Sequence, residues 1–182
     1  AFFDELAEPF FVYDQRNTIH WQRMTALARY CAAELGIQHI VIDSLMKCRI
    51  APEDYAAQKR FVDALCAVAK DTGLHVHLIA HGRKGATELA FMDKHDIKGA
   101  SEISDQADNV FTLWRNKRKE EAMQAGESID PMDPDAILNC SKQRHGEWEG
   151  KIRLWFHPRS QQYMEAATSA PRTFEELRSD VR

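Results

Sequence analysis

Charged and polar side chains directly follow two apolar runs of the sequence. The run Ile40–Ile42 ends in Asp43 and Ser44, and the run Leu78–Ala80 ends in His81. If each run is a buried strand of a parallel sheet, these side chains lie beyond the C-terminal strand ends, where functional groups gather in α/β folds. There a carboxylate such as Asp43 can hold Mg²⁺, directly or through water, beside a nucleotide phosphate. The alternative is that Asp43 and Ser44 only cap a turn.

His81 is expected close to Asp43, because their two strands should be neighbours. In that place it reaches a γ-phosphate or a water beside the metal; a histidine that merely begins a polar loop is the alternative. His75, His77 and His81 share the parity of one strand face, which also suggests a metal-dependent hydrolase. At ~3.3 Å per residue, however, His75 and His81 lie about 20 Å apart, too far to share one ion.

Two further groups of cations have possible roles in binding phosphates. The Gly-containing segment after His81 carries Arg83, Lys84, Lys94, His95 and Lys98. Such a loop suits contacts with a phosphate backbone, and an ordinary solvated loop explains it equally well. Lys142 and Arg144 precede an expected hairpin turn at His145–Gly146. A rigid hairpin can present these cations to a γ-phosphate on a neighbouring subunit, as a trans-acting arginine does; a solvated turn is the alternative.

The elements that must position these residues alternate between strand and helix. Strands are expected at residues 10–14, 40–42, 74–80, 109–114, 136–141, 152–156 and 162–164. The 10–14 strand is expected to be short and buried, and the 40–42 strand is expected to be buried on both faces. The alternation predicts parallel strands with right-handed crossovers, and the late hairpin makes the sheet mixed. The fold class is therefore α/β.

Three helices are expected between these strands. The first follows Asn17 and Thr18, which are residue types that cap helix N-termini, and it ends before Gly36. The second runs from Pro52 to Gly73, and its inner face consists of Phe61, Leu65, Val68 and Ala69. The third covers residues 100–106. Residues 82–98 are expected to form a loop. Residues 116–134 are charged and broken by proline, so we expect a mobile surface excursion. The tail 166–182 is polar, with at most a frayed helix at 173–177.

Composition and charge exclude several classes of protein. The chain has 182 residues, 44% of them hydrophobic, which suffices for one domain with a core. A net charge of -4 gives no overall basic field for nucleic acid, although a local basic patch is compatible with it. The cysteines are Cys31, Cys48, Cys66 and Cys140, with no CxxC pair, which favours a reduced, cytoplasmic protein. No apolar run approaches the ~18 residues of a membrane span, and the first residues lack the basic region of a signal peptide.

Four segments, in this order, resemble the RecA-like (P-loop NTPase) motor domain of ring-shaped DnaB-family replicative helicases. They are "FFDEL…FFVYD", "HIVIDSLMK", "LHVHLIAHGRK" and "DIKGASEISDQADNVFTLWRNK" with "LNCSKQRHGEWEGKIRLWF". The second is similar to Walker B, and the third to the strand that carries the phosphate-sensing histidine of the family. The resemblance is greatest to the helicase half of bacteriophage primase-helicases and to mitochondrial Twinkle. It covers about residues 2–164.

The resemblance implies a site shared between subunits. Asp43 would order Mg²⁺ beside ATP or another nucleoside triphosphate, with Ser44 next to it, and His81 would sense the γ-phosphate. Lys142 and Arg144 would form the finger pair that acts on the nucleotide of the neighbouring subunit. Arg83, Lys84, Lys94 and Lys98 would belong to a central loop that contacts single-stranded DNA.

The resemblance also implies a fold and a set of partners. Residues 1–165 would be the C-terminal part of a three-layer RecA-like motor domain, mainly parallel with a C-terminal antiparallel hairpin, and 166–182 a tail. The motor would translocate on single-stranded DNA, 5′ to 3′, and unwind duplex. It would assemble into a ring in the full-length protein and work with a primase domain and replisome proteins in the bacterial host cytoplasm.

Two departures from the family pattern limit this interpretation. No GxxxxGK[ST] motif occurs in the sequence, so nothing cradles the β- and γ-phosphates. We therefore expect the C-terminal two-thirds of a motor domain, with the phosphate loop and the catalytic Glu upstream of Ala1, and no ATP hydrolysis by this chain alone. Asp105 stands where the family usually has Gln, with Gln106 displaced by one, so neither receives a role. A non-catalytic RecA-like module that binds single-stranded DNA or a replisome partner is the other interpretation.

Overall fold

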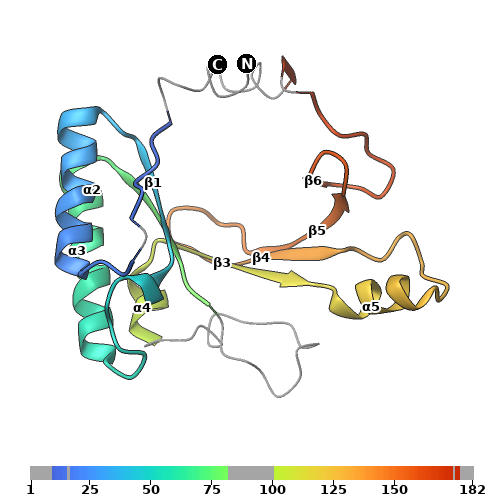
Figure 1. Ribbon diagram of the computed structural model, residues 1–182, viewed down its shortest axis with the longest axis horizontal. Coiled ribbons are helices and arrows are strands. Elements are labelled where there is room, and N and C mark those ends of the chain that lie inside the picture. The colour runs from blue at the N-terminus through green and yellow to red at the C-terminus, as the bar shows by residue number, and fades with distance from the viewer. Residues whose placement is uncertain (1–9, 16, 82–100, 174, 177–182) are drawn as a thin grey trace. The chain divides into compact units, whose positions relative to one another are not determined.

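The computed structural model describes residues 10–15, 17–81, 101–173 and 175–176 (Figure 1). The chain divides into two compact units, and each is described by itself. The first comprises Ala1–Arg83 with Ile97–Ala107, and the second Lys84–Asp96 with Asp108–Arg182. Both contain helix and strand, so the predicted α/β class is confirmed. The predicted loop at 82–98 lies outside the described residues.

The first unit is a parallel pair of strands packed against helices. Its elements are α2 (Trp21–Leu35), β1 (His39–Asp43), the 3-10 helix η1 (Leu45–Lys47), α3 (Tyr55–Thr72), β2 (His75–Ile79) and α4 (Ser101–Gln106). The parallel register pairs His39 with His75 and Asp43 with Ile79. This strand–helix–strand connection is the one that the sequence predicts.

Local signals explain where the two long helices end. Gly36 and Gly73 follow α2 and α3 with φ of 63° and 75°, a left-handed conformation that glycine adopts without steric cost. The side chain of Asp54 caps α3 by accepting a hydrogen bond from Ala57 N at 2.9 Å. The predicted N-cap of α2 at Asn17 or Thr18 is wrong. His20 occupies that position without a side-chain cap.

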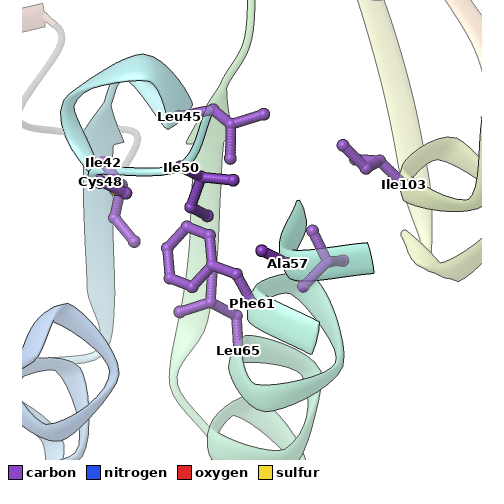
Figure 2. Close-up of a cluster of buried hydrophobic side chains, with 9 residues drawn as sticks. Ile42, Leu45, Cys48, Ile50, Ala57, Phe61, Leu65 and Ile103 are labelled. Atoms are coloured by element: carbon purple, nitrogen blue, oxygen red, sulfur yellow. The ribbon is translucent and has the colours of Figure 1, made fainter. Parts of the chain in front are cut away.

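The core of the first unit lies between α3 and the parallel strands (Figure 2). Phe61 is fully buried at its centre, and the ring of Trp21 from α2 lies 6.1 Å from the Phe61 ring. The other buried members of the cluster are Ile42, Leu45, Cys48, Ile50, Ala57, Val62, Leu65 and Ile103. Leu45, Cys48 and Ile50 belong to the turn that follows Asp43, so this core fixes the position of that turn. The predicted inner face of α3 is confirmed.

Two predictions about burial are wrong. Residues 10–14 form no strand, and Phe10 is 61% exposed. No described strand pairs with this segment, so its aromatic side chains gain no sheet to pack on. The strand β1 is buried on one face only, because Ile40 and Ile42 face the helices while Val41, with the opposite parity, is 63% exposed.

The second unit is built on an antiparallel sheet. Its strands follow the order β3 (Asn109–Arg115), β4 (Ala136–Gln143), β5 (Gly150–His157) and β6 (Gln162–Met164). The hairpin of β4 and β5 and the short strand β6 are as predicted. The described strands form a two-stranded parallel sheet and a separate four-stranded antiparallel sheet, so the prediction of one mainly parallel sheet is not confirmed. The predicted parallel pairing holds for β1 with β2, whereas β3 pairs antiparallel with β4. The chain returns directly beside β3, since Asn116 N donates to Asp135 O at 2.8 Å.

The segment 116–134 is ordered, contrary to the prediction of a mobile excursion. It forms α5 (Lys117–Ala125), which ends at Gly126 with φ of 71°. Lys119 is buried, and its Nζ lies 2.8 Å from Asp135 Oδ1 and 2.6 Å from Asp133 O. The sequence pattern misleads here because a run of charged residues is typical of a fully solvated segment. One of them instead forms an internal ion pair.

Replacing Asn116 by alanine should destabilise the second unit by about 1–2 kcal/mol. Its Oδ1 caps α5 by accepting from Lys119 N at 3.1 Å, and its Nδ2 donates to Pro134 O at 3.0 Å. Urea unfolding followed by the amide signals of β3 and β4 measures the loss. Gln124→Ala, at an exposed position of the same helix, is the matched control, and an equal effect of both variants would contradict the capping role.

None of the helices in the described part of the chain is both long and apolar enough to span a membrane.

Candidate functional site

Asp43 and His81 lie at the same edge of the parallel pair. Asp43 ends β1 opposite Ile79, the last residue of β2, and His81 follows two residues later. Both side chains are exposed. Among the described residues, none forms a hydrogen bond or an ion pair with the Asp43 carboxylate. The prediction that these two strand ends are neighbours is therefore confirmed, and both the carboxylate of Asp43 and the imidazole of His81 are accessible at this edge.

Buried residues and a backbone hydrogen bond hold the turn after Asp43 in place. Ser44 is only 3% exposed, its backbone oxygen accepts from Lys47 N at 2.9 Å, and the Asp43–Ser44 peptide bond is cis. Cys48 is fully buried, and burial raises the pKa of its thiol to about 11, so the thiol stays protonated and serves as packing. The sequence marks both Asp43 and Ser44 as candidates for nucleotide binding; of these two residues, Asp43 is exposed and Ser44 is buried.

His81 also lies beside the loop that follows this turn. It lines a small cavity of about 90 Å³ together with Leu45, Met46, Ile50, Pro52 and Gln58. The amide of Gln58, on α3, donates to Pro52 O at 3.0 Å and so holds the loop to the helix. The Asp43 turn and His81 are thus linked both through the strand register and through this cavity.

Arg49 connects the residues that precede α2 to the turn after Asp43. Sequence reasoning missed these contacts. Its Nε donates to Thr18 Oγ1 at 2.8 Å, and its Nη1 lies 3.1 Å from His20 Nε2. Because a guanidinium only donates, the His20 nitrogen must be the acceptor. Ile19 N also donates to Lys47 O at 2.9 Å. No sequence signal joins these positions, since they lie about thirty residues apart and meet only in the fold.

A histidine cluster lies at the opposite end of the same two strands. His39 Nδ1 and His77 Nε2 are 3.2 Å apart, and the His75 ring lies 4.4 Å from the His77 ring. His39 was missed because its partners come from another strand. His81 lies past the far end of β2 from His75, as the sequence predicts. Within the residues described, no three His, Cys, Asp or Glu side chains form a group that could hold a metal ion.

Acidification should destabilise the first unit through His77. Desolvation lowers the pKa of His77 from its usual value, and repulsion from His75 and His39 adds to the effect. A lowered folded-state pKa means that the unfolded chain takes up the proton first, so stability is full above the unfolded value of about 6.5 and falls as the pH drops through the folded value. His77→Gln should flatten this loss between about pH 7.5 and 5.5 in urea unfolding followed by α3 amide signals. An unchanged slope would contradict it, and His145→Gln, in the second unit, is the control.

Lys142 and Arg144 lie together at the end of a strand, in the second unit. Lys142 pairs with Val110 in the β3–β4 register, and Arg144 N donates to Asp108 O at 2.8 Å just beyond it. Arg144 Nη1 lies 3.1 Å from Asp108 Oδ1, and His145 Nε2 lies 3.7 Å from the same oxygen. Sequence reasoning found the two cations and the turn but missed Asp108, which only the strand register brings to them.

The predicted site residues therefore fall into three groups. The structure brings together Asp43, Ser44 and His81 in the first unit and Lys142 with Arg144 in the second. The predicted DNA-contacting residues Arg83, Lys84, Lys94 and Lys98, with His95, lie outside the described residues.

Comparison with family models and with curated proteins finds no relative. No family model matches the chain, and no curated protein matches it significantly. The function proposed next is therefore supported by the residues, their order along the chain and their geometry.

Proposed function

We propose that this chain is part of an ATP-dependent DNA helicase motor of the RecA-like, DnaB-family type. The observation that carries the proposal is the parallel pairing of β1 with β2, which puts Asp43 and His81 at one edge. In parallel α/β sheets the C-terminal strand edge is where ligands bind. The resemblance of the four segments, in the family order, supports the same assignment.

Each residue has one task in the proposed site. The Asp43 carboxylate would hold Mg²⁺, directly or through water, beside the phosphates of ATP or another nucleoside triphosphate. His81 senses the γ-phosphate. Arg144, assisted by Lys142, comes from the next subunit of the ring and stabilises the charge that develops during transfer to water. Mg²⁺ supplies charge neutralisation, while the chain's own residues hold and orient the nucleotide.

The proposed motor acts on single-stranded DNA inside a ring. Arg83, Lys84, Lys94 and Lys98 are the proposed contacts to the DNA backbone. Such contacts are electrostatic and carry no sequence information, so a few cations per subunit suffice although the chain is acidic overall. A primase domain and replisome proteins are the proposed further partners.

Hydrolysis by the complete protein, with and without single-stranded DNA, tests the proposal. Asp43→Asn should lower ATP turnover at least about 100-fold, because it removes the charge that orders the metal. His81→Ala should leave nucleotide binding largely intact and abolish the stimulation by DNA. Unchanged DNA stimulation in His81→Ala would remove His81 from the sensor role, and full turnover in Asp43→Asn would contradict the proposed site. Asp63→Asn, at an exposed position of α3, is the control.

A second candidate function is favoured by one observation, the lack of GxxxxGK[ST] in the 182 residues. A RecA-like module without this loop has no cradle for the phosphates and would bind single-stranded DNA or a replisome partner without catalysis. The motor proposal predicts no turnover by this chain alone and a phosphate loop elsewhere in the complete protein. Turnover by the isolated chain that Asp43→Asn abolishes would contradict the first of these predictions.

A further inference from the structure

Asp108 holds Arg144 at both its backbone and its side chain. Asp108 O accepts from Arg144 N at 2.8 Å, and Asp108 Oδ1 lies 3.1 Å from Arg144 Nη1. The backbone contact extends the β3–β4 ladder beyond the pair of Asn109 and Gln143. The sheet therefore fixes the backbone of Arg144, and the guanidinium of Arg144 forms an ion pair with the Asp108 carboxylate.

The side-chain contact is of a kind that a phosphate can replace. The side chains of Arg144 and Asp108 are 43% and 48% exposed, and ion pairs at that exposure are weak. A guanidinium binds carboxylate and phosphate oxygens with the same forked geometry. A nucleoside triphosphate carries more negative charge than one carboxylate and therefore competes with Asp108 for Arg144.

His145 lies in reach of the same carboxylate oxygen. Its Nε2 is 3.7 Å from Asp108 Oδ1, and the side chain is largely exposed. When protonated, it offers a second cation to Asp108 after the guanidinium has left. The three side chains form one small exposed cluster at the end of the β3–β4 pair, where the chain enters the predicted hairpin turn between β4 and β5.

We propose that Asp108 is a positioning residue, which holds Arg144 at rest and releases it to the nucleotide bound by the neighbouring subunit. The inference rests on the proposed function and adds a resting state to its finger residue. Nucleotide binding at the subunit interface must first break the Asp108–Arg144 contact. Asp108 therefore raises the KM for ATP and takes no part in hydrolysis.

ATP turnover by the complete protein carrying Asp108→Asn tests the inference. The substitution keeps the backbone oxygen that pairs with Arg144 N and removes only the charge. We expect KM to fall about three- to fivefold, the worth of an exposed ion pair, with kcat within about twofold of the wild type. Asp108→Glu should restore the wild-type KM. Glu147→Gln, which removes an exposed carboxylate from the same hairpin, should change neither constant.

Two results would overturn the inference, and a parallel variant tells them apart from failure of the proposed function. An unchanged KM in Asp108→Asn, or a tenfold loss of kcat, would remove the resting role of Asp108. If Arg144→Ala abolishes turnover in the same assays, only the role of Asp108 falls. If Arg144→Ala keeps full turnover, the finger assignment fails, and the inference about Asp108 fails with it.

Discussion

Replacing Arg144 by alanine is expected to lower ATP turnover of the complete protein by about a thousandfold or more, the range found for arginine fingers. The physical reason is that the guanidinium meets charge that develops only in the transition state, so its loss affects kcat more than nucleotide binding. Lys142→Ala should have a smaller effect in the same direction, since an ammonium is a point charge without the forked geometry.

Steady-state hydrolysis, with ATP binding measured separately, checks this expectation. Arg153→Ala is the matched control, because Arg153 is an exposed cation on the adjacent strand β5. Both variants lose one positive charge from the second unit, but only Arg144 has the proposed finger role. Turnover of Arg144→Ala within tenfold of the wild type would contradict that role.

Replacing Phe61 by alanine is expected to cost the first unit about 3–5 kcal/mol of unfolding free energy. Phe61 is fully buried in the cluster that also contains Leu45 and Ile50 of the turn after Asp43 (Figure 2). A loss of this size is a large part of the 5–15 kcal/mol that stabilises typical domains. The position of the Asp43 turn depends on this core, so the substitution should also loosen the candidate site.

Urea unfolding of this chain, followed by the amide signals of α2 and α3, measures the loss. Phe61→Leu, which keeps most of the buried volume, should cost less, about 1.5 kcal/mol or below. Phe11→Ala, at an exposed position, should cost almost nothing. A loss below about 1 kcal/mol in Phe61→Ala would contradict the central place of Phe61 in the core.

The sequence predicts the first unit well where strong local signals agree. These signals are the apolar spacing of α3, the cap at Asp54 and the glycines after α2 and α3. Each acts within a few residues, so it can be recognised in a single sequence. Periodicity fails at residues 10–14, because an apolar run forms a strand only when a partner strand is present. It also fails at Val41, because burial of a strand face depends on what covers it.

The residues of the candidate site also differ in whether a local sequence signal marks them. Asp43, His81 and Arg144 could be marked because each stands at the end of a recognisable strand. Asp108, Arg49 and His39 could not, because their partners come from distant parts of the chain and meet them only through strand register or turn packing. The ion pair of Lys119 shows the same limit. In the sequence it is one cation in a charged segment, whereas the fold places it against Asp135.

ATP turnover by mixtures of two inactive variants tests the central claim most directly. Arg144→Ala subunits keep Asp43, and Asp43→Asn subunits keep Arg144, so a mixed ring contains some interfaces with both. For random mixing of equal amounts into rings, up to about a quarter of the interfaces are intact, and turnover should rise from near zero towards that fraction. Mixtures as inactive as their components, in rings shown to exchange subunits, would contradict a site shared between Asp43 of one subunit and Arg144 of the next.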